Sequence, residues 1–393
     1  MTDPVRERRI DIAICASLAL ATVVAAGVTA QSLGFTRDEG YYFKAAELYW
    51  GWFRELLHSP ASALSFASID RGWSYNHEHP ALLKTLFAWS FGLDDALGMP
   101  VATHNAMRLP AWCVAGVAVA VTYALARAML SRRAAVLAAL LFVCMPRVFW
   151  HMHLSCFDVG VTAAHTALVL AYVRYRHTNK GALVVGIAFG LCAAVKHNVI
   201  PVPAILVLHY LLTEMTSTRR IPLAFLSMMF VGPLVYLAHW PWLWPHPFER
   251  FGAYVAYHLG HENYPILYFG DLLTHPPFPI AFPFVMSAVT IPVPTLVAMI
   301  LGVALGTVVA VRFLRARFAS APSSSSPSSS SSSSSTLSLA GGDAILLLLN
   351  AAYPFVLIAL PSTPKFGGTK HWMNALPFLC VLAAFACEEV ARR

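Results

Sequence analysis

Two adjacent carboxylates, Asp38 and Glu39, directly follow the first long apolar segment of the sequence. They stand in the run Gly34-Phe35-Thr36-Arg37-Asp38-Glu39-Gly40-Tyr41-Tyr42, next to an arginine and several aromatic residues. A carboxylate held within hydrogen-bond reach can take a proton from a nucleophile, and neighbouring charges can tune its pKa for that task. The pair therefore predicts a general base, although an acidic pair in this position is also typical of an ordinary solvated loop.

Histidines form the second group of residues that could do chemistry. His77, Glu78 and His79 lie within three residues, and His151 and His153 form another close pair. These residue types suit a transition metal such as zinc or manganese, which could help to bind a phosphate. Their spacing matches no known zinc signature, and hydrogen bonds to neighbouring loops would explain His151 and His153 equally well. The sequence therefore predicts no definite metal site or cofactor, and it leaves a divalent metal open.

The composition indicates which kind of protein positions these residues. Hydrophobic residues make up 58% of the 393 residues and charged residues only 12%, which is far more apolar than a soluble domain. A bilayer core requires closed barrels or helices of about 20 apolar residues. The sequence therefore predicts an all-α, polytopic transmembrane helix bundle. Its spans, about ten, are expected near 10–31, 106–130, 134–150, 157–174, 182–196, 199–213, 221–240, 283–311, 343–361 and 372–389.

The basic residues predict how these helices are oriented. If the N-terminus is cytoplasmic, the positive-inside rule is satisfied by six clusters: Arg6-Arg8-Arg9, Arg132-Arg133, Arg174-Arg176-Lys180, Arg219-Arg220, Arg312-Arg315-Arg317 and Arg392-Arg393. The net charge of +8 thus reflects topology and not a nucleic-acid partner. The same orientation places most acidic residues and most of the 16 histidines outside. These residues predict a catalytic or binding surface there, although interfacial anchoring would explain single histidines.

The expected spans form one membrane core that is interrupted once. Residues 1–317 are expected to form this core, with external loops at 32–105 and 241–282. Residues 318–342 contain a serine-rich run, which is typical of a disordered linker, and residues 343–393 supply the last two spans. In the first external loop, residues 41–57 and the segment after Pro80 have the mixed aromatic and apolar character of helices in the membrane interface.

The order of these segments resembles the GT-C superfamily of membrane glycosyltransferases. A first span, an Asp-Glu pair, interfacial helices and a His-Pro segment look like those of dolichyl-phosphate-mannose protein mannosyltransferases and bacterial lipid A aminoarabinose transferases. The chain ends soon after its tenth expected span, without the additional spans and external domain of the large members, which leaves acceptor recognition open. Further similar segments cover nearly the whole chain: Arg108-Leu109-Pro110, Pro146-Arg147, Asp158, Lys196, His239 to Pro245, Tyr264 to Pro277, and Gly368-Thr369-Lys370-His371-Trp372.

The resemblance implies an enzyme of a bacterial inner (plasma) membrane, with cytoplasmic termini, that moves a sugar from a polyprenyl-phosphate donor to an acceptor on the outer face. Asp38 would be the general base, Glu39 its neighbour or an acceptor-binding partner, and Asp158 a second carboxylate. Direct attack from the opposite face would invert the anomeric centre. An anionic lipid head at the interface needs cations. The substrate-binding residues are expected to be Arg147, Lys196, Lys370, His371, His79 and Tyr41.

Two other functions compete with this one. The first is a transporter or flippase of a lipid-linked or anionic solute, and the second is an inactive scaffold that binds lipid or partner proteins. A transporter is expected to carry ionisable residues near the middle of its spans, whereas here they gather at one edge. The sequence leaves open the sugar, the metal dependence, the oligomeric state and the nature of the acceptor, which could be protein, lipid or glycan.

Overall fold

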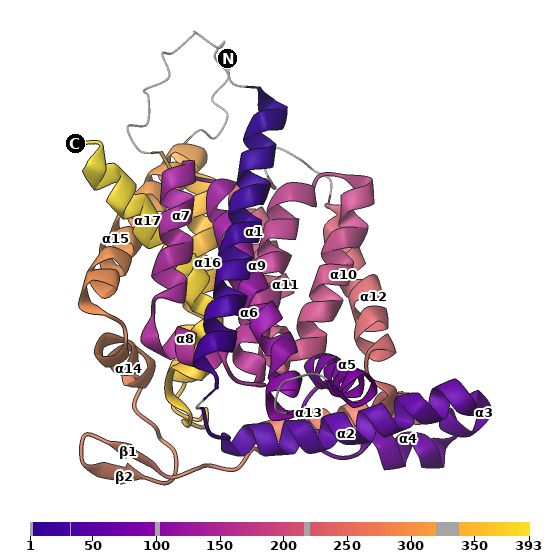
Figure 1. Cartoon of the computed structure of the whole chain (residues 1–393). Coiled ribbons are helices and arrows are strands. Elements are labelled where there is room, and N and C mark those ends of the chain that lie inside the picture. Colours follow the sequence, from indigo (N-terminus) through magenta and orange to yellow (C-terminus); the bar gives the residue numbers. More distant parts are fainter. Residues whose placement is uncertain (1–2, 32, 99–102, 216–220, 320–337) are drawn as a thin grey trace.

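The computed structural model describes residues 3–31, 33–98, 103–215, 221–319 and 338–393. Within these ranges, upright helices form a bundle, and a layer of helices lies across one end of it (Figure 1). The predicted helical membrane bundle with interfacial helices is therefore confirmed. The serine-rich linker predicted at 318–342 lies largely outside the described residues.

The upright bundle contains the segments that were predicted to span the membrane. Among the described residues, five helices are long and apolar enough to cross a membrane alone, or six if the bent pair of α7 and α8 is one span. Other apolar helices, such as α10, α11 and α12, are shorter. The helices of the bundle are α1 (Pro4–Thr29), α6 (Thr103–Arg127), α7 (Arg132–Val143), α8 (Pro146–Met152), α9 (Phe157–Tyr175), α10 (Asn179–Val195), α11 (Val202–Thr213), α12 (Leu223–Ala238), α14 (Phe282–Thr290), α15 (Val293–Ala319), α16 (Gly341–Ala359) and α17 (Leu376–Ala391).

Two of the predicted spans are each broken into two helices. The segment 134–150 bends by 74° between α7 and α8, and the segment 283–311 is divided between α14 and α15. In both cases the break precedes a proline, and the preceding residues Met145 and Ile291 have extended ψ angles of 121° and 133°. A proline ring disfavours helical backbone in the residue before it, so an apolar run that contains proline need not be one helix.

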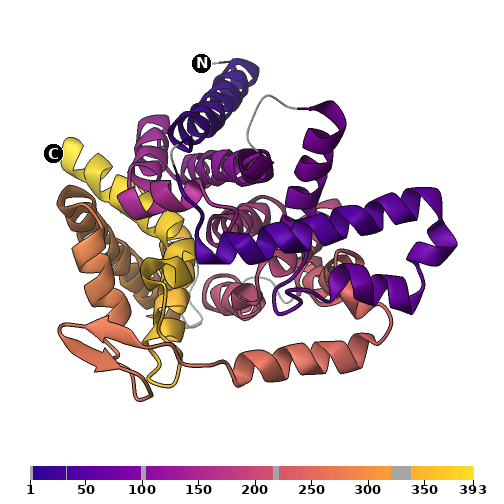
Figure 2. The same cartoon turned by 60° about the horizontal axis from the view of Figure 1, so that its bottom comes forward.

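The layer across the end of the bundle is built mainly from the first predicted external loop. Helix α2 runs across the bundle, and Figure 2 shows α2, α4 and α13 together on this end. A short antiparallel hairpin, which the all-α prediction did not include, pairs Ile266 with Leu273. The elements of the layer are α2 (Arg37–His58), α3 (Pro60–Ala63), α4 (Phe66–Trp73), α5 (Leu82–Leu97), α13 (Pro247–Leu259), β1 (Ile266–Tyr268) and β2 (Asp271–Leu273), with the 3-10 helices η1 (His197–Val199), η2 (Pro241–Leu243) and η3 (Gly368–Ala375) near this end.

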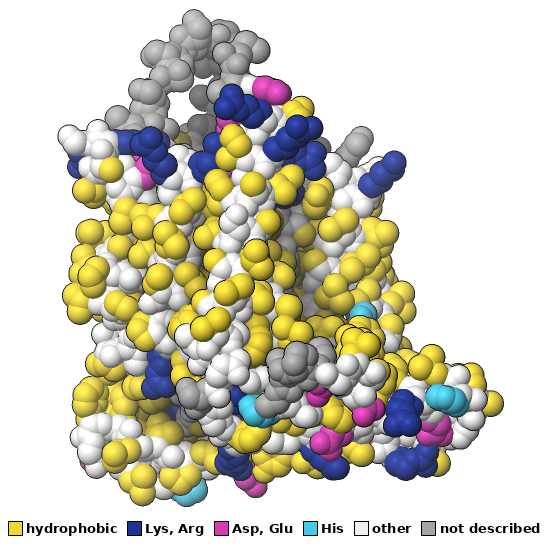
Figure 3. Space-filling model, viewed as in Figure 1, with side chains coloured by type: hydrophobic (Ala, Val, Ile, Leu, Met, Phe, Trp, Pro, Cys, Tyr) yellow, Lys and Arg dark blue, Asp and Glu magenta, His cyan; other side chains and the backbone are white. Residues whose placement is uncertain are grey.

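Polar and hydrophobic side chains occupy different levels along the axis of the bundle, in agreement with the arrangement that the predicted spans require. Figure 3 shows Lys and Arg side chains gathered at the end where both termini lie, a broad hydrophobic belt below them, and mixed acidic, basic and His side chains at the opposite end. A hydrophobic belt between two polar ends is what a bilayer requires of an integral membrane protein. The helices α2, α5 and α13 lie at the end that is richer in acidic residues.

Close helix packing in the belt depends on small residues. Helices α10 and α12 are in contact along Gly186 and Gly190, which are spaced by four residues as in small-residue membrane contacts. A Cβ atom on Gly190 would lie 2.6 Å from the backbone oxygen of Gly232 and 2.5 Å from Cβ of Val235. Glycine at this position therefore allows α12 to pack directly on α10, which ends next to Lys196.

Candidate functional site

Helix α2 begins at the acidic pair because local capping fixes its first turn. Thr36 is the N-cap in extended backbone, and its N–H donates to Oε2 of Glu39 at 3.0 Å. This is the reciprocal capping arrangement that a Thr-x-x-Glu sequence favours. Asp38 and Glu39 therefore both lie in the first helical turn, where the helix dipole also favours negative charge.

Glu39 is buried and fully engaged with α6. Its carboxylate accepts two hydrogen bonds from Arg108, at 2.7 and 2.8 Å, and both side chains have no exposed surface. The N–H of Ser155 donates to the same carboxylate at 3.1 Å. Arg108 also donates to the carbonyl oxygens of Leu33 and Gly34, at 3.1 and 2.8 Å. This pair therefore fixes the start of α2 against the bundle.

Burial alone would raise the pKa of Glu39. The hydrogen bonds from Arg108 and from the backbone N–H groups of Thr36 and Ser155 outweigh this effect and hold its pKa below the ordinary value. Glu39 thus stays ionised at neutral pH and is held in place. The sequence analysis named Arg108 as part of the Arg108-Leu109-Pro110 segment but did not predict it as a site residue. A charged residue at the start of an apolar span was the available signal for it.

Asp38 lies on a more open side of the same turn and meets the late basic segment. Nζ of Lys370 donates to Oδ2 of Asp38 at 3.2 Å, although the two residues are 332 positions apart in the sequence. The Asp38 side chain is 41% exposed and that of Lys370 is 18% exposed. Asp38 therefore combines a cationic neighbour with access from solvent, which a residue that takes a proton from a substrate needs.

Asp158 lies at the start of α9 and forms the second carboxylate of the site. Nζ of Lys196 donates to its Oδ1 at 2.9 Å, and Nδ1 of His151 lies 3.7 Å from its Oδ2. The charges of Lys196 and Lys370 both act on this carboxylate, which is almost completely buried. The structure thus brings Asp38, Asp158, Lys196 and Lys370 into one cluster of alternating charge.

Aromatic and histidine rings surround this cluster. Tyr42 packs against Phe157 at 4.4 Å between ring centroids, and His79 lies 5.1 Å from Phe157. Burial, followed by the positive charge of Lys84, keeps the pKa of His79 well below its ordinary value, so its ring is neutral. Among the buried atoms of the described side chains, Nδ1 of His79, Nδ1 of His151 and Nε2 of His371 have no hydrogen-bond partner. Buried polar atoms normally have partners, so these three atoms are candidates to bind a ligand.

A buried lysine fixes the turn that carries His79. The ammonium group of Lys84 donates to the carbonyl oxygens of Asn76 and His79, at 2.5 and 2.9 Å, and it lies over the ring of Tyr49. Asn76 has a positive φ of 55°, which a tight turn requires and which asparagine tolerates. Burial lowers the pKa of Lys84 to about 7. The segment from Asn76 to His79 is therefore held in place by these contacts with Lys84.

Of the other predicted site residues, His371 lies beside the charge cluster, where the charges of the cluster act on its ring. His371 is buried, and its ring lies 4.4 Å from Phe366, beside the residue that contacts Asp38. Arg147 is exposed on α8, and Tyr41 is 45% exposed on α2 next to Arg37. Within the described ranges, no group of three or more His, Cys, Asp or Glu residues has a geometry that could hold a metal ion.

The tryptophan-rich segment after α12 packs against the first external loop. Trp240 and Trp242 are buried, and Trp242 stacks on His77 with ring centroids 4.4 Å apart. Arg250 on α13 donates to the Trp242 carbonyl oxygen and pairs with Asp70 on α4 at 2.6 Å. These contacts join the two segments that were predicted to be external around the candidate site.

The comparisons with known proteins agree with this architecture. The family model of dolichyl-phosphate-mannose-protein mannosyltransferases matches residues 85–242. A comparison with curated proteins finds no significant match. The structure is similar to ArnT from Cupriavidus metallidurans bound to undecaprenyl phosphate, with a TM-score of 0.59 and 16% identity over 95% of this chain. It is also similar to the oligosaccharyltransferase AglB from Archaeoglobus fulgidus, solved with an inhibitory peptide and a dolichol-phosphate, with a TM-score of 0.56 and 14% identity over 95% of this chain.

This chain covers 60% of the ArnT chain and 50% of the AglB chain, so both of those proteins contain regions with no counterpart in this alignment. At these identities the similarity establishes the fold, and the family model adds a sequence match over α5 to η2. The chain therefore has the GT-C fold and resembles the membrane glycosyltransferases of that superfamily in both sequence and structure.

Proposed function

We propose that this protein is a membrane glycosyltransferase that moves a sugar from a polyprenyl-phosphate donor to an acceptor hydroxyl. The observation that carries the proposal is the contact between Asp38 and Lys370, which places a proton acceptor beside a cation at one aqueous edge of the bundle. The similar structures of ArnT and AglB contain undecaprenyl phosphate and dolichol-phosphate, respectively, which supports a lipid-phosphate donor.

In the proposed reaction, Asp38 takes the proton of the acceptor hydroxyl. The acceptor oxygen attacks the anomeric carbon, the bond from that carbon to the phosphate oxygen breaks, and the lipid phosphate leaves with the bonding electrons. Because Oδ2 of Asp38 is bound to Lys370, Oδ1 is the oxygen that would take the proton. Attack on the side opposite to the leaving phosphate would invert the configuration.

The leaving phosphate needs positive charge, and the two lysines supply it. An ammonium group has three N–H donors, so Lys370 and Lys196 each keep two after donating to their carboxylates. Charge-assisted donors in a site with little water can stabilise the charge that develops on the leaving oxygen. His371, with its unpartnered Nε2, would add a neutral donor or acceptor at the same place.

Glu39 and Asp158 are given supporting roles in this proposal. The resemblance left two roles open for Glu39, neighbour of the base or acceptor-binding partner. Its deep burial and its full set of hydrogen bonds favour the first role, in which it positions Asp38. Asp158 would hold Lys196 and balance the charge of the lysines before the donor binds.

The test is transfer by the purified protein in liposomes that contain radiolabelled polyprenyl-phosphate sugars. We expect Asp38→Asn to lower the rate by about 10² to 10⁴, the range for removal of a general base, without changing folding or insertion. Glu47→Gln is the matched control, because Glu47 is exposed on the same helix α2 and, within the described residues, its one ion pair is with the exposed Lys44. Unchanged transfer by Asp38→Asn would contradict the mechanism, and no turnover with any donor would favour the transporter alternative.

The side of the membrane is tested separately. We propose that the site faces the extracytoplasmic space, because the arginine clusters lie at the opposite end of the bundle. Phe269 is 78% exposed at the tip of the hairpin on the site side. In intact cells, a membrane-impermeant maleimide should label Phe269→Cys above the wild-type background. Labelling only after the cells are opened would contradict the proposed orientation.

A further inference from the structure

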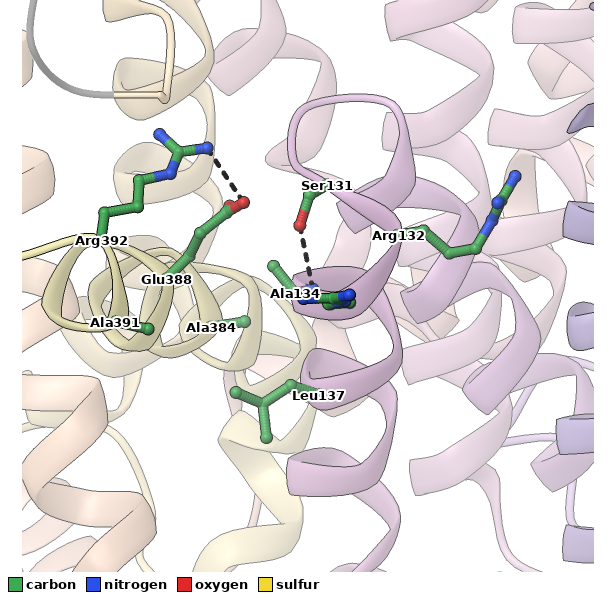
Figure 4. A pocket seen from close by; sticks show the side chains of 9 residues that line it. Ser131, Arg132, Ala134, Leu137, Ala384, Glu388, Ala391 and Arg392 are labelled. Carbon is green, nitrogen blue, oxygen red and sulfur yellow. Dashed lines mark hydrogen bonds and ion pairs between the residues drawn. The ribbon is translucent and has the colours of Figure 1, made fainter. Parts of the chain in front are cut away.

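A pocket at the arginine-rich end of the bundle has no part in the proposed reaction. It has a volume of about 540 Å³ and lies between the first turns of α7 and the last turns of α17 (Figure 4). Its lining is arginine and glutamate at the polar end and alanine and leucine beside them. The lining residues are Ser131, Arg132, Arg133, Ala134, Leu137, Ala384, Glu388, Ala391 and Arg392.

The positive charge in this pocket is only partly balanced by the protein. Figure 4 shows Arg132 directed away from α17, and its guanidinium pairs with Glu7 and Asp11 of α1. Arg392 pairs with Glu388 at 3.1 Å and with Glu389 at 3.3 Å. Arg133 is exposed and forms no ion pair or hydrogen bond with any side chain in the described ranges. Arg132 and Arg392 are therefore balanced by neighbouring carboxylates, and within the described ranges Arg133 is the lining arginine that has no carboxylate partner.

One acceptor atom in the pocket is also unsatisfied. Oε2 of Glu388 is buried and has no hydrogen-bond partner, while the other oxygen binds Arg392. A ligand for this pocket would therefore combine a negative group for Arg133 with a hydrogen-bond donor for Glu388.

The rest of the lining is apolar and leads into the hydrophobic belt. Leu137 lies more than one turn of α7 below Arg133, and Ala134 and Ala384 are small, buried residues on the two helices. Because Ala134 and Ala384 are buried where α7 packs on α17, the apolar surface open to a hydrocarbon chain is that of the half-buried Leu137. The pocket is thus polar at the level of the arginine clusters and apolar toward the middle of the membrane.

We propose that this pocket binds one anionic glycerophospholipid whose head group carries a hydroxyl, which is the chemistry of phosphatidylglycerol. Its phosphate lies at Arg133, a head-group hydroxyl donates to Oε2 of Glu388, and an acyl chain packs along Leu137. Basic pockets between spanning helices are known to hold anionic lipid head groups. The proposal does not depend on the glycosyltransferase reaction, because the pocket lies at the other end of the bundle from Asp38.

The test uses the full chain purified from liposomes with equal amounts of phosphatidylglycerol and phosphatidylcholine, followed by native mass spectrometry of the retained lipid. We expect one phosphatidylglycerol to be retained in preference to phosphatidylcholine. Arg133→Ala should weaken this retention about fivefold, the typical effect of one basic residue near an anionic membrane surface. Arg8→Ala, an exposed arginine on α1 at the same end of the bundle, is the matched control and should leave retention unchanged.

A second variant tests the shape of the pocket with all its charges present. Leu137→Trp should fill the apolar part and abolish retention, while the thermal unfolding of the protein shows that the bundle is intact. Equal losses from Arg133→Ala and Arg8→Ala would mean general attraction to the surface and would overturn the proposal. Retention of phosphatidylethanolamine above phosphatidylglycerol would also overturn it, because the pocket would then select an ammonium group for Glu388.

Discussion

The buried pair of Glu39 and Arg108 offers the most direct test of how the site is built. Both side chains are inaccessible to solvent and share two hydrogen bonds of 2.7 and 2.8 Å. Glu39→Gln removes the negative charge with little change in size. It leaves the Arg108 guanidinium buried without a counter-charge, which typically costs about 3–5 kcal/mol of folding free energy.

The expected change in unfolding temperature follows from this free energy. About 1 kcal/mol corresponds to about 2–4 °C in domains of 150–250 residues and to about 2 °C or less in a larger chain, so we expect Glu39→Gln to unfold at most about 6–10 °C lower. Arg108→Met should have an effect of similar size, because it leaves the carboxylate unpaired. The double variant should lose less than the sum of the two single variants, since neither charge then remains.

The pH dependence gives a second measure of the same pair. The pKa of Glu39 is lowered in the folded state, so its ionisation stabilises the protein above the ordinary value near 4.5. This contribution is lost as the pH falls through the folded-state pKa. Wild-type protein should therefore lose stability on acidification below about pH 4.5 more steeply than Glu39→Gln, which has no proton to bind at this position.

Thermal unfolding in detergent, measured by fluorescence between pH 3.5 and 8, gives the unfolding temperature of each variant and its pH dependence. Transfer activity can be measured on the same samples. Activity should also fall in Glu39→Gln, because the first turn of α2 carries Asp38 as well. If both single variants unfold within about 1 °C of wild type, the pair does not anchor α2 and the role given to Glu39 is wrong.

Three further predictions follow from the same contacts. Lys370→Met should lower the transfer rate by about 10² to 10³ and raise the KM for the donor, while Lys44→Met, exposed on α2, should change neither in the same assay. Gly190→Val should destabilise the protein by about 1–3 kcal/mol, because its Cβ would overlap with atoms of α12. Gly252→Ala should leave thermal unfolding unchanged, because a Cβ on Gly252 has no neighbouring atom within 4 Å. Burial keeps the pKa of His79 well below 6.5 in the folded state, so the free energy of unfolding should fall as the pH drops below about 6.5. His79→Gln should reduce the slope of unfolding free energy against pH by the equivalent of about one proton, measured by unfolding at a series of pH values.

Candidate site residues could be predicted from the sequence where the prediction depended on the type of residue and on the expected side of the membrane. The acidic pair after the first apolar segment and the basic pair Lys370-His371 before the last were both predicted at the outer edge, and the structure joins Asp38 to Lys370. The start of α2 was also encoded locally, since Thr36 and Glu39 have the spacing of a capping box. What is local in the chain, or fixed by the bilayer, was therefore predictable.

Contacts between distant segments were not predictable in the same way. The sequence shows that Glu39 and Arg108 are both charged, but not that they meet with no exposed surface. The breaks at Met145 and Ile291 were missed because hydropathy alone treats an apolar run as continuous, although the prolines that follow were a visible signal. The hairpin at Ile266–Leu273 was missed because three-residue strands carry too little alternation to be recognised.

The two carboxylates of the candidate site differ in their exposure to solvent, and the roles proposed for them depend on this difference. Asp158 and Asp38 each contact a lysine, and Lys370 acts on both. A general base must be reached by the acceptor, and the Asp38 side chain is 41% exposed while that of Asp158 is 6% exposed. Binding of an anionic phosphate to the lysines would weaken their hold on both carboxylates, but only Asp38 could then turn toward an acceptor at the aqueous edge. This asymmetry, and not the residue types, is the reason why we propose proton transfer for Asp38 and charge balance for Asp158.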